Sequence, residues 1–107
     1  MEDLLALTKS LTTIPSPTGY TTEIMSFLEE KKKKIGYDTQ QNRKGSLIVT
    51  VPGQNTEQQR FITAHVDTLG AIVRAIKPDG RLKMDLIGGF KYNAIEGEYC
   101  TVHTQAG

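Results

Sequence analysis

Apolar residues recur at helical spacing in two stretches near the start of the chain. Their apolar positions are Leu4, Leu5, Leu11, Ile24, Phe27, Leu28 and Ile35. The first stretch predicts a helix over residues 3–13, which must end at the two prolines and the glycine that follow it. The second predicts a helix over residues 20–35, because Gly36 is a natural left-handed terminator.

Beyond Gly36 the pattern changes to the short alternation that is typical of β-strands. We expect strands over residues 37–42, 47–51, 60–66, 70–76, 81–87 and 98–104. An Arg-Lys-Gly turn separates the first two strands, and a Pro-Asp-Gly turn separates the fourth from the fifth, so each of these pairs predicts a hairpin. The first half of the chain therefore predicts an α+β arrangement and the second half an all-β one, and the expected fold class is α+β or α/β.

A histidine and an aspartate stand two residues apart at the end of the expected strand 60–66, as His65 and Asp67. Residues two apart on a strand share one face, with Cα atoms separated by roughly 6.5–7 Å. This pair suits a metal site, in which a ring nitrogen binds the cation and the carboxylate fixes the tautomer. On spacing alone, a hydrogen-bonded structural pair is the commoner explanation, so both interpretations stay open here.

Length and charge exclude some classes of protein. The 107 residues suffice for one small domain or for a piece of something larger, and the net charge of +1 lacks the basic excess of a nucleic-acid binder. The four lysines at residues 31–34 are explained by the helix end. With no run of about 18 apolar residues and an acidic start, we expect no membrane partner and a cytoplasmic location. Cys100 is expected to be buried and reduced.

Five segments follow one another at compatible spacings. They read IPSPTG at 14–19, KGSLI at 44–48, AHVDTLG at 64–70, GGF at 88–90 and IEGEY at 95–99. In this order they resemble the N-terminal part of the glutamyl aminopeptidase and endoglucanase-M family, the tetrahedral-aminopeptidase type of metallopeptidase. The resemblance extends over nearly the whole chain.

The resemblance implies both an architecture and a site. Residues 1–69 would be the N-terminal part of a catalytic domain, and residues 70–107 would begin an inserted β-barrel-like dimerisation domain. His65 matches the first metal ligand, and Asp67 matches the catalytic carboxylate that supports the metal site. The family also implies two zinc or cobalt ions that activate water to remove N-terminal residues from a peptide substrate, and it implies a homo-oligomer.

In the family, the other metal ligands and the general-base glutamate follow the inserted domain. Further candidate ligands in this sequence are Asp79, Asp85, Glu96, Glu98 and His103, but no pattern places them beside His65. We therefore expect the 107 residues alone to be inactive and to bind metal weakly or not at all. The alternative is a non-catalytic oligomerisation or interaction module derived from such a peptidase.

Overall fold

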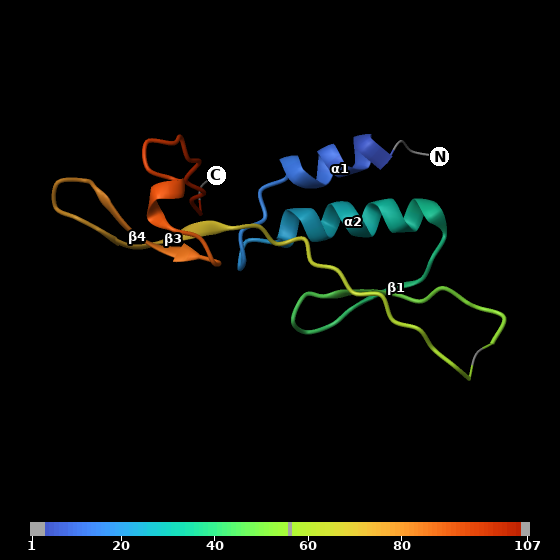
Figure 1. Ribbon diagram of the computed structural model, residues 1–107. Helices are drawn as coiled ribbons and strands as arrows, with labels where there is room; N and C mark the ends of the chain where they lie inside the picture. The colour runs from blue at the N-terminus through green and yellow to red at the C-terminus, as the bar shows by residue number, and fades with distance from the viewer. Residues whose placement is uncertain (1–3, 56, 106–107) are drawn as a thin grey trace. The chain divides into compact units, whose positions relative to one another are not determined.

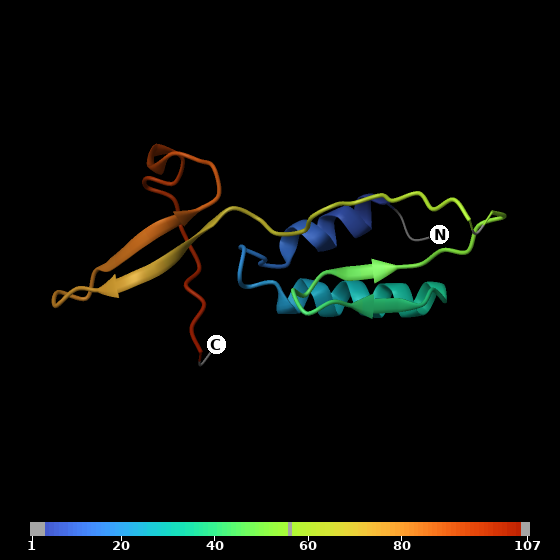
Figure 2. The same ribbon diagram turned by 90° about the horizontal axis from the view of Figure 1, so that it is seen from below.

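Two helices precede two β-hairpins in this chain, whose computed structural model describes residues 4–55 and 57–105. The elements are α1 (Leu4–Thr13), α2 (Thr22–Ile35), β1 (Thr39–Gln41), β2 (Leu47–Val49), β3 (Gly70–Ile76), β4 (Leu82–Ile87) and the 3-10 helix η1 (Tyr92–Ala94). The strands form two separate antiparallel sheets, β1 with β2 and β3 with β4 (Figures 1 and 2). The chain divides between Thr68 and Leu69 into two units with one hairpin each. The expected mixture of helices and strands is confirmed.

Both expected helices are present. The predicted start of α1 at residue 3 lies outside the described residues, and α2 begins at Thr22 instead of residue 20. Gly36 ends α2 in the left-handed conformation, with φ of 86°, and its N–H reaches the carbonyls of Lys32 and Lys33. Glycine adopts this geometry without the clash that a Cβ would cause, so the terminator is confirmed.

The first hairpin is confirmed, with strands shorter than expected. Its turn is organised by Asn42, whose Oδ1 accepts hydrogen bonds from the N–H groups of Lys44 at 3.0 Å and Ser46 at 2.9 Å. Asparagine side chains commonly stabilise turns in this way. Strand β1 contacts α2, so this hairpin belongs to the same unit as the helices.

The second hairpin is also confirmed, with β3 and β4 on either side of the Pro-Asp-Gly turn. The N–H of Lys77 donates to the carbonyl of Arg81 at 2.8 Å, which closes the turn. The register shifts between Val73 and Ala75, so a bulge interrupts the ladder.

The expected burial of Cys100 is wrong, because its side chain is exposed.

Two expected strands are wrong. Residues 60–66 and 98–104 form no strand in the described structure, and Figure 2 shows the first as a coil, which belongs to the first unit. The apolar side chains that suggested these strands are largely exposed: Phe61 is 82% exposed, Ile62 98%, and Tyr99 is fully exposed. A strand needs a neighbour that pairs with its backbone, and within the described residues neither segment has a strand beside it.

The loop between the helices is joined by backbone and side-chain hydrogen bonds to the end of residues 60–68, which we call the extended segment. Ser16 is completely buried, and its hydroxyl donates to the carbonyl of Val66 at 2.8 Å. Its own carbonyl accepts from the N–H of Thr68 at 2.8 Å, within an isolated parallel bridge between Pro17 and Thr68. These bonds hold two segments together that are 50 residues apart in sequence.

Ile24, on α2, is the buried apolar side chain among the described residues, with 1% exposure. The apolar core of the first unit, as far as the structure describes it, is therefore small.

None of the described helices has the length and apolar character that crossing a membrane requires.

Replacing Ile24 by alanine should lower the free energy of unfolding by about 2–4 kcal/mol, since it leaves a cavity at a buried position of α2. Ile35→Ala is the matched control on the same helix, because Ile35 is 66% exposed and its truncation should cost about 0.5 kcal/mol or less. Urea unfolding followed by far-UV circular dichroism compares the two. Equal losses would show that Ile24 is no core residue.

Replacing Ser16 by alanine should cost about 1–3 kcal/mol, because the part-buried Val66 carbonyl loses its donor. Ser10→Ala is the control, since the Ser10 hydroxyl donates only to the carbonyl of Ala6 within its own helix, at 3.0 Å. Alanine is also the better helix former, so this variant should be neutral or slightly more stable. The same unfolding experiment measures both, and a Ser16→Ala variant as stable as Ser10→Ala would contradict the expectation.

Candidate metal-binding site

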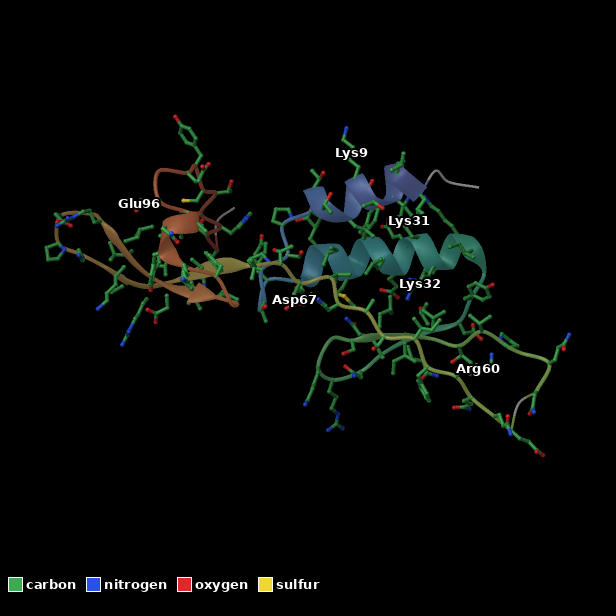
Figure 3. All side chains as sticks on the ribbon, in the orientation of Figure 1. Lys9, Lys31, Lys32, Arg60, Asp67 and Glu96 are labelled. Atoms are coloured by element: carbon green, nitrogen blue, oxygen red, sulfur yellow. The ribbon has the colours of Figure 1, made fainter. Side chains whose placement is uncertain are left out.

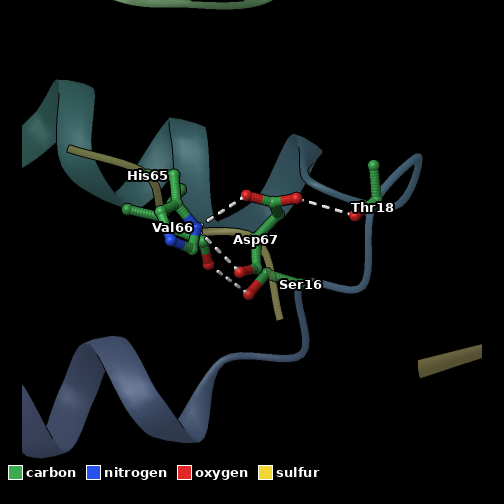
Figure 4. Close-up of polar contacts among 5 residues, drawn as sticks. All are labelled: Ser16, Thr18, His65, Val66 and Asp67. Atoms are coloured by element: carbon green, nitrogen blue, oxygen red, sulfur yellow. Dashed lines mark hydrogen bonds and ion pairs between the residues drawn. The ribbon is translucent and has the colours of Figure 1, made fainter. Parts of the chain in front are cut away.

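Asp67 lies where the extended segment meets the loop between α1 and α2 (Figure 3). Its carboxylate contacts two side chains, one with each oxygen (Figure 4). The hydroxyl of Thr18 donates to Oδ2 at 2.7 Å, and Nδ1 of His65 lies 3.0 Å from Oδ1. The structure thus brings together the two residues that the sequence singled out, although they do not lie on a strand.

The contacts of His65 define its tautomer. Nδ1 faces Oδ1 of Asp67 and also the backbone carbonyl of Asp67, which is 3.3 Å away. A carbonyl can only accept a hydrogen bond, and so can an ionised carboxylate. Nδ1 therefore carries the proton in the neutral ring, and the lone pair is on Nε2.

The hydrogen bonds around Asp67 favour its charged form. The pKa of Asp67 is lowered, first by the hydrogen bond from Thr18 and next by the one from His65, while partial desolvation opposes them. Because the pKa in the folded state is depressed, this stabilisation is present above the ordinary value of about 3.9 and is lost as the pH falls through the folded pKa. Asp67 is therefore an anion at neutral pH.

The donor set fits part of a metal shell. The His65 side chain is 86% exposed, so its Nε2 is accessible, and a neutral imidazole is a good ligand for zinc or cobalt. Within residues 4–55 and 57–105, no three His, Cys, Asp or Glu side chains gather as a metal site. These residues can thus supply one histidine ligand with its supporting carboxylate, whereas a structural zinc shell takes four ligands.

Two other acidic candidates from the sequence are paired with arginines instead. Asp79 Oδ2 lies 2.6 Å from Nη2 of Arg81, and Asp85 Oδ2 lies 3.5 Å from Nη1 of Arg74. Both pairs belong to the second hairpin, and the bond with Arg81 is the main cause that lowers the pKa of Asp79. These carboxylates therefore have local roles in their own hairpin.

The lysine run of α2 contacts its own helix. Lys33 lies 3.1 Å from Glu29, one turn earlier, and Lys31 lies over the ring of Phe27 at 5.3 Å from its centroid. Lys31 and Lys32 are labelled on α2 in Figure 3. Burial lowers the pKa of Lys32. The run lies at the end of α2, as the sequence predicts.

Ser16 and Thr18 are the residues around this pair that sequence reasoning missed. The IPSPTG segment forms the loop between α1 and α2 that its prolines and glycine predict, but its pattern does not say which distant residues its hydroxyls reach. A hydroxyl between two prolines was the available signal, because such a backbone is held in a fixed extended path.

Comparison with known proteins gives a consistent result. The sequence model of the M42 glutamyl aminopeptidase family matches residues 45–107. The aminopeptidase YhfE of Bacillus subtilis (strain 168) is 55% identical over 103 residues, which are 96% of this chain and 30% of that protein. The glutamyl aminopeptidase of Lactococcus lactis subsp. cremoris (strain MG1363) is 26% identical over 106 residues, which are 98% of this chain and 30% of that protein.

The chain therefore spans about 30% of the length of the curated relatives it matches. The family match covers more than half of its residues and includes both His65 and Asp67. The chain belongs to the M42 glutamyl aminopeptidase family.

Proposed function

We propose that this chain is the N-terminal part of a metal-dependent aminopeptidase. In this proposal Nε2 of His65 is a metal ligand, and Asp67 fixes the tautomer and the orientation of that ring. The observation that carries it is the contact of 3.0 Å between Nδ1 of His65 and Oδ1 of Asp67. This contact keeps the proton on Nδ1, so the lone pair that could bind a cation is on Nε2 of an exposed side chain. Membership of the family supports the choice of reaction.

Two divalent cations, zinc or cobalt, would supply the chemistry when bound, by polarising the scissile carbonyl and activating water. The role of this chain is to orient the imidazole of His65 and to place the negative charge of Asp67 beside its Nδ1. A carboxylate behind a ligand histidine raises its basicity and so strengthens its bond to a cation. The substrate class proposed is a peptide with a free N-terminus.

The division of labour along the chain is part of the same proposal. Residues 1–69 would belong to the catalytic domain and residues 70–107 to the start of an inserted domain. The remaining ligands and the general base would come from other residues of a longer polypeptide, so the 107 residues alone would not catalyse the reaction. The cytoplasmic location expected from the sequence stays a prediction.

The second unit offers a surface for self-association, which is the second part of the proposal. Its hairpin exposes Ile72, Val73 and Ile76, with exposed fractions of 58%, 40% and 73%. A two-stranded hairpin is marginally stable alone, and apolar side chains on it gain stability when a partner covers them. A homo-oligomer formed through this hairpin would supply that cover, and the same surface would serve the alternative of a non-catalytic interaction module.

In the full polypeptide that carries this chain, His65→Ala should lower kcat/KM for peptide hydrolysis by at least about 100-fold, because a metal ligand is lost. The bound metal, measured by inductively coupled plasma mass spectrometry, should fall with it. Asp67→Asn should cost about 10–100-fold, since only the support of the ligand is lost.

His103→Ala is the matched control for this experiment, because the sequence has two histidines and the other belongs to the second unit. It should keep both its metal and its activity. The isolated 107-residue chain should hydrolyse nothing and bind zinc or cobalt weakly. Activity retained in His65→Ala, or tight stoichiometric metal in the isolated chain, would refute the proposal.

The full polypeptide should sediment as a multiple of its single-chain mass, and Ile76→Asp should shift it toward the monomer, because a charge would be buried in the contact. Ile48→Asp is the control, since Ile48 is 47% exposed on the hairpin of the first unit. Analytical ultracentrifugation measures both variants. A monomeric parent, or equal dissociation by the two variants, counts against self-association through the second unit.

A further inference from the structure

We propose that Thr18 is a positioning residue, which holds the Asp67 carboxylate in the orientation that presents His65 for binding. The consequence for catalysis rests on the proposed function, whereas the geometry does not. The Thr18 hydroxyl donates to Asp67, and Asp67 in turn contacts the imidazole of His65, so Thr18 acts through Asp67.

The first argument is the division of the two carboxylate oxygens. Oδ1 is used by His65 at 3.0 Å, and Oδ2 is used by the hydroxyl of Thr18 at 2.7 Å (Figure 4). The terminal torsion of an aspartate is broad and roughly two-fold, so a single contact at Oδ1 leaves the group free to rotate. A second donor at Oδ2, from a distant part of the chain, removes that freedom.

The second argument is that Thr18 itself is held firmly. Pro17 precedes it, and the carbonyl of Pro17 accepts from the N–H of Tyr20 at 2.7 Å, which closes a turn around Thr18. Gly19 completes this turn with φ of 93°, a conformation that glycine adopts at no steric cost. The buried Ser16 fixes the start of the turn to Val66 and Thr68, the two neighbours of Asp67. The loop that carries Thr18 is therefore bonded to the residues on both sides of Asp67, which fixes the hydroxyl donor relative to the carboxylate acceptor.

The third argument is exposure. The Asp67 side chain is 37% exposed and the His65 side chain 86%, so packing does not hold either group in place. In an open site of this kind, directed hydrogen bonds are what fixes orientation. The charge-assisted bond from Thr18 is the shorter of the two side-chain contacts that Asp67 makes.

The experiment first reads the tautomer of His65, without metal and without substrate. In the 107-residue chain, ¹⁵N NMR signals of the neutral imidazole should show His65 with its proton on Nδ1. The variant His103→Gln assigns the signals, because the chain has two histidines. Thr18→Val should shift the ring toward the mixture of tautomers of the urea-unfolded chain, whereas Thr18→Ser keeps the hydroxyl and should keep Nδ1–H.

Thr8→Val is the matched control. It also removes a threonine hydroxyl, one that donates to the carbonyl of Leu4 within α1 at 2.8 Å, and it should leave the tautomer unchanged. In the full polypeptide at saturating metal, Thr18→Val should lower kcat about 10-fold with KM changed less than about two-fold, which is the low end for a lost supporting contact. Thr18→Ser should restore kcat to within about two-fold of the parent.

The proposal is overturned if the parent chain shows no preference for Nδ1–H, or if Thr18→Val keeps that preference. It is also overturned if Thr18→Ser is as impaired as Thr18→Val, since the hydroxyl would then not be the cause. Failure of the proposed function looks different: His65→Ala would keep its metal and activity, while the tautomer of the parent would still respond to Thr18→Val.

Discussion

The hydrogen bonds of Ser16 are the constraint on which the rest of the first unit depends. They join the loop after α1 to the segment that carries His65 and Asp67, with the hydroxyl on one neighbour of Asp67 and the carbonyl on the other. Because Ser16 is completely buried, water cannot compete for these bonds. Together with the bond from Thr18 to Asp67, they link the loop between the helices to the candidate site.

Local chemistry made much of the fold predictable. Helix α2 ends at Gly36, and the two hairpins turn at residues whose backbones suit tight turns, so these elements follow from a few positions. The pairing of His65 with Asp67 was predictable for a related reason, since residues two apart are neighbours in any extended backbone. Helices, turns and this pair are all local features.

What failed depends on distant partners. The apolar pattern of residues 60–66 indicates burial, but Phe61 and Ile62 are exposed in the described structure, and no strand there pairs with them. The reach of Thr18 to Asp67 was equally hidden, because 49 residues separate them and no periodicity connects them. A pattern of apolar residues indicates that one face of a segment is buried, but it does not identify the element that packs against that face.

The separation of 50 residues between Ser16 and Val66 also has a kinetic meaning. Closing a flexible loop of that length costs roughly 3.5 kcal/mol in chain entropy, beyond a constant term, before any contact compensates it. The helices and hairpins need only local contacts, so they can form early. The candidate site forms only when the loop with Ser16 and the segment with Val66 come into contact. During synthesis the loop with Ser16 and Thr18 leaves the ribosome well before its partners, and the site is therefore among the last parts of the first unit to assemble.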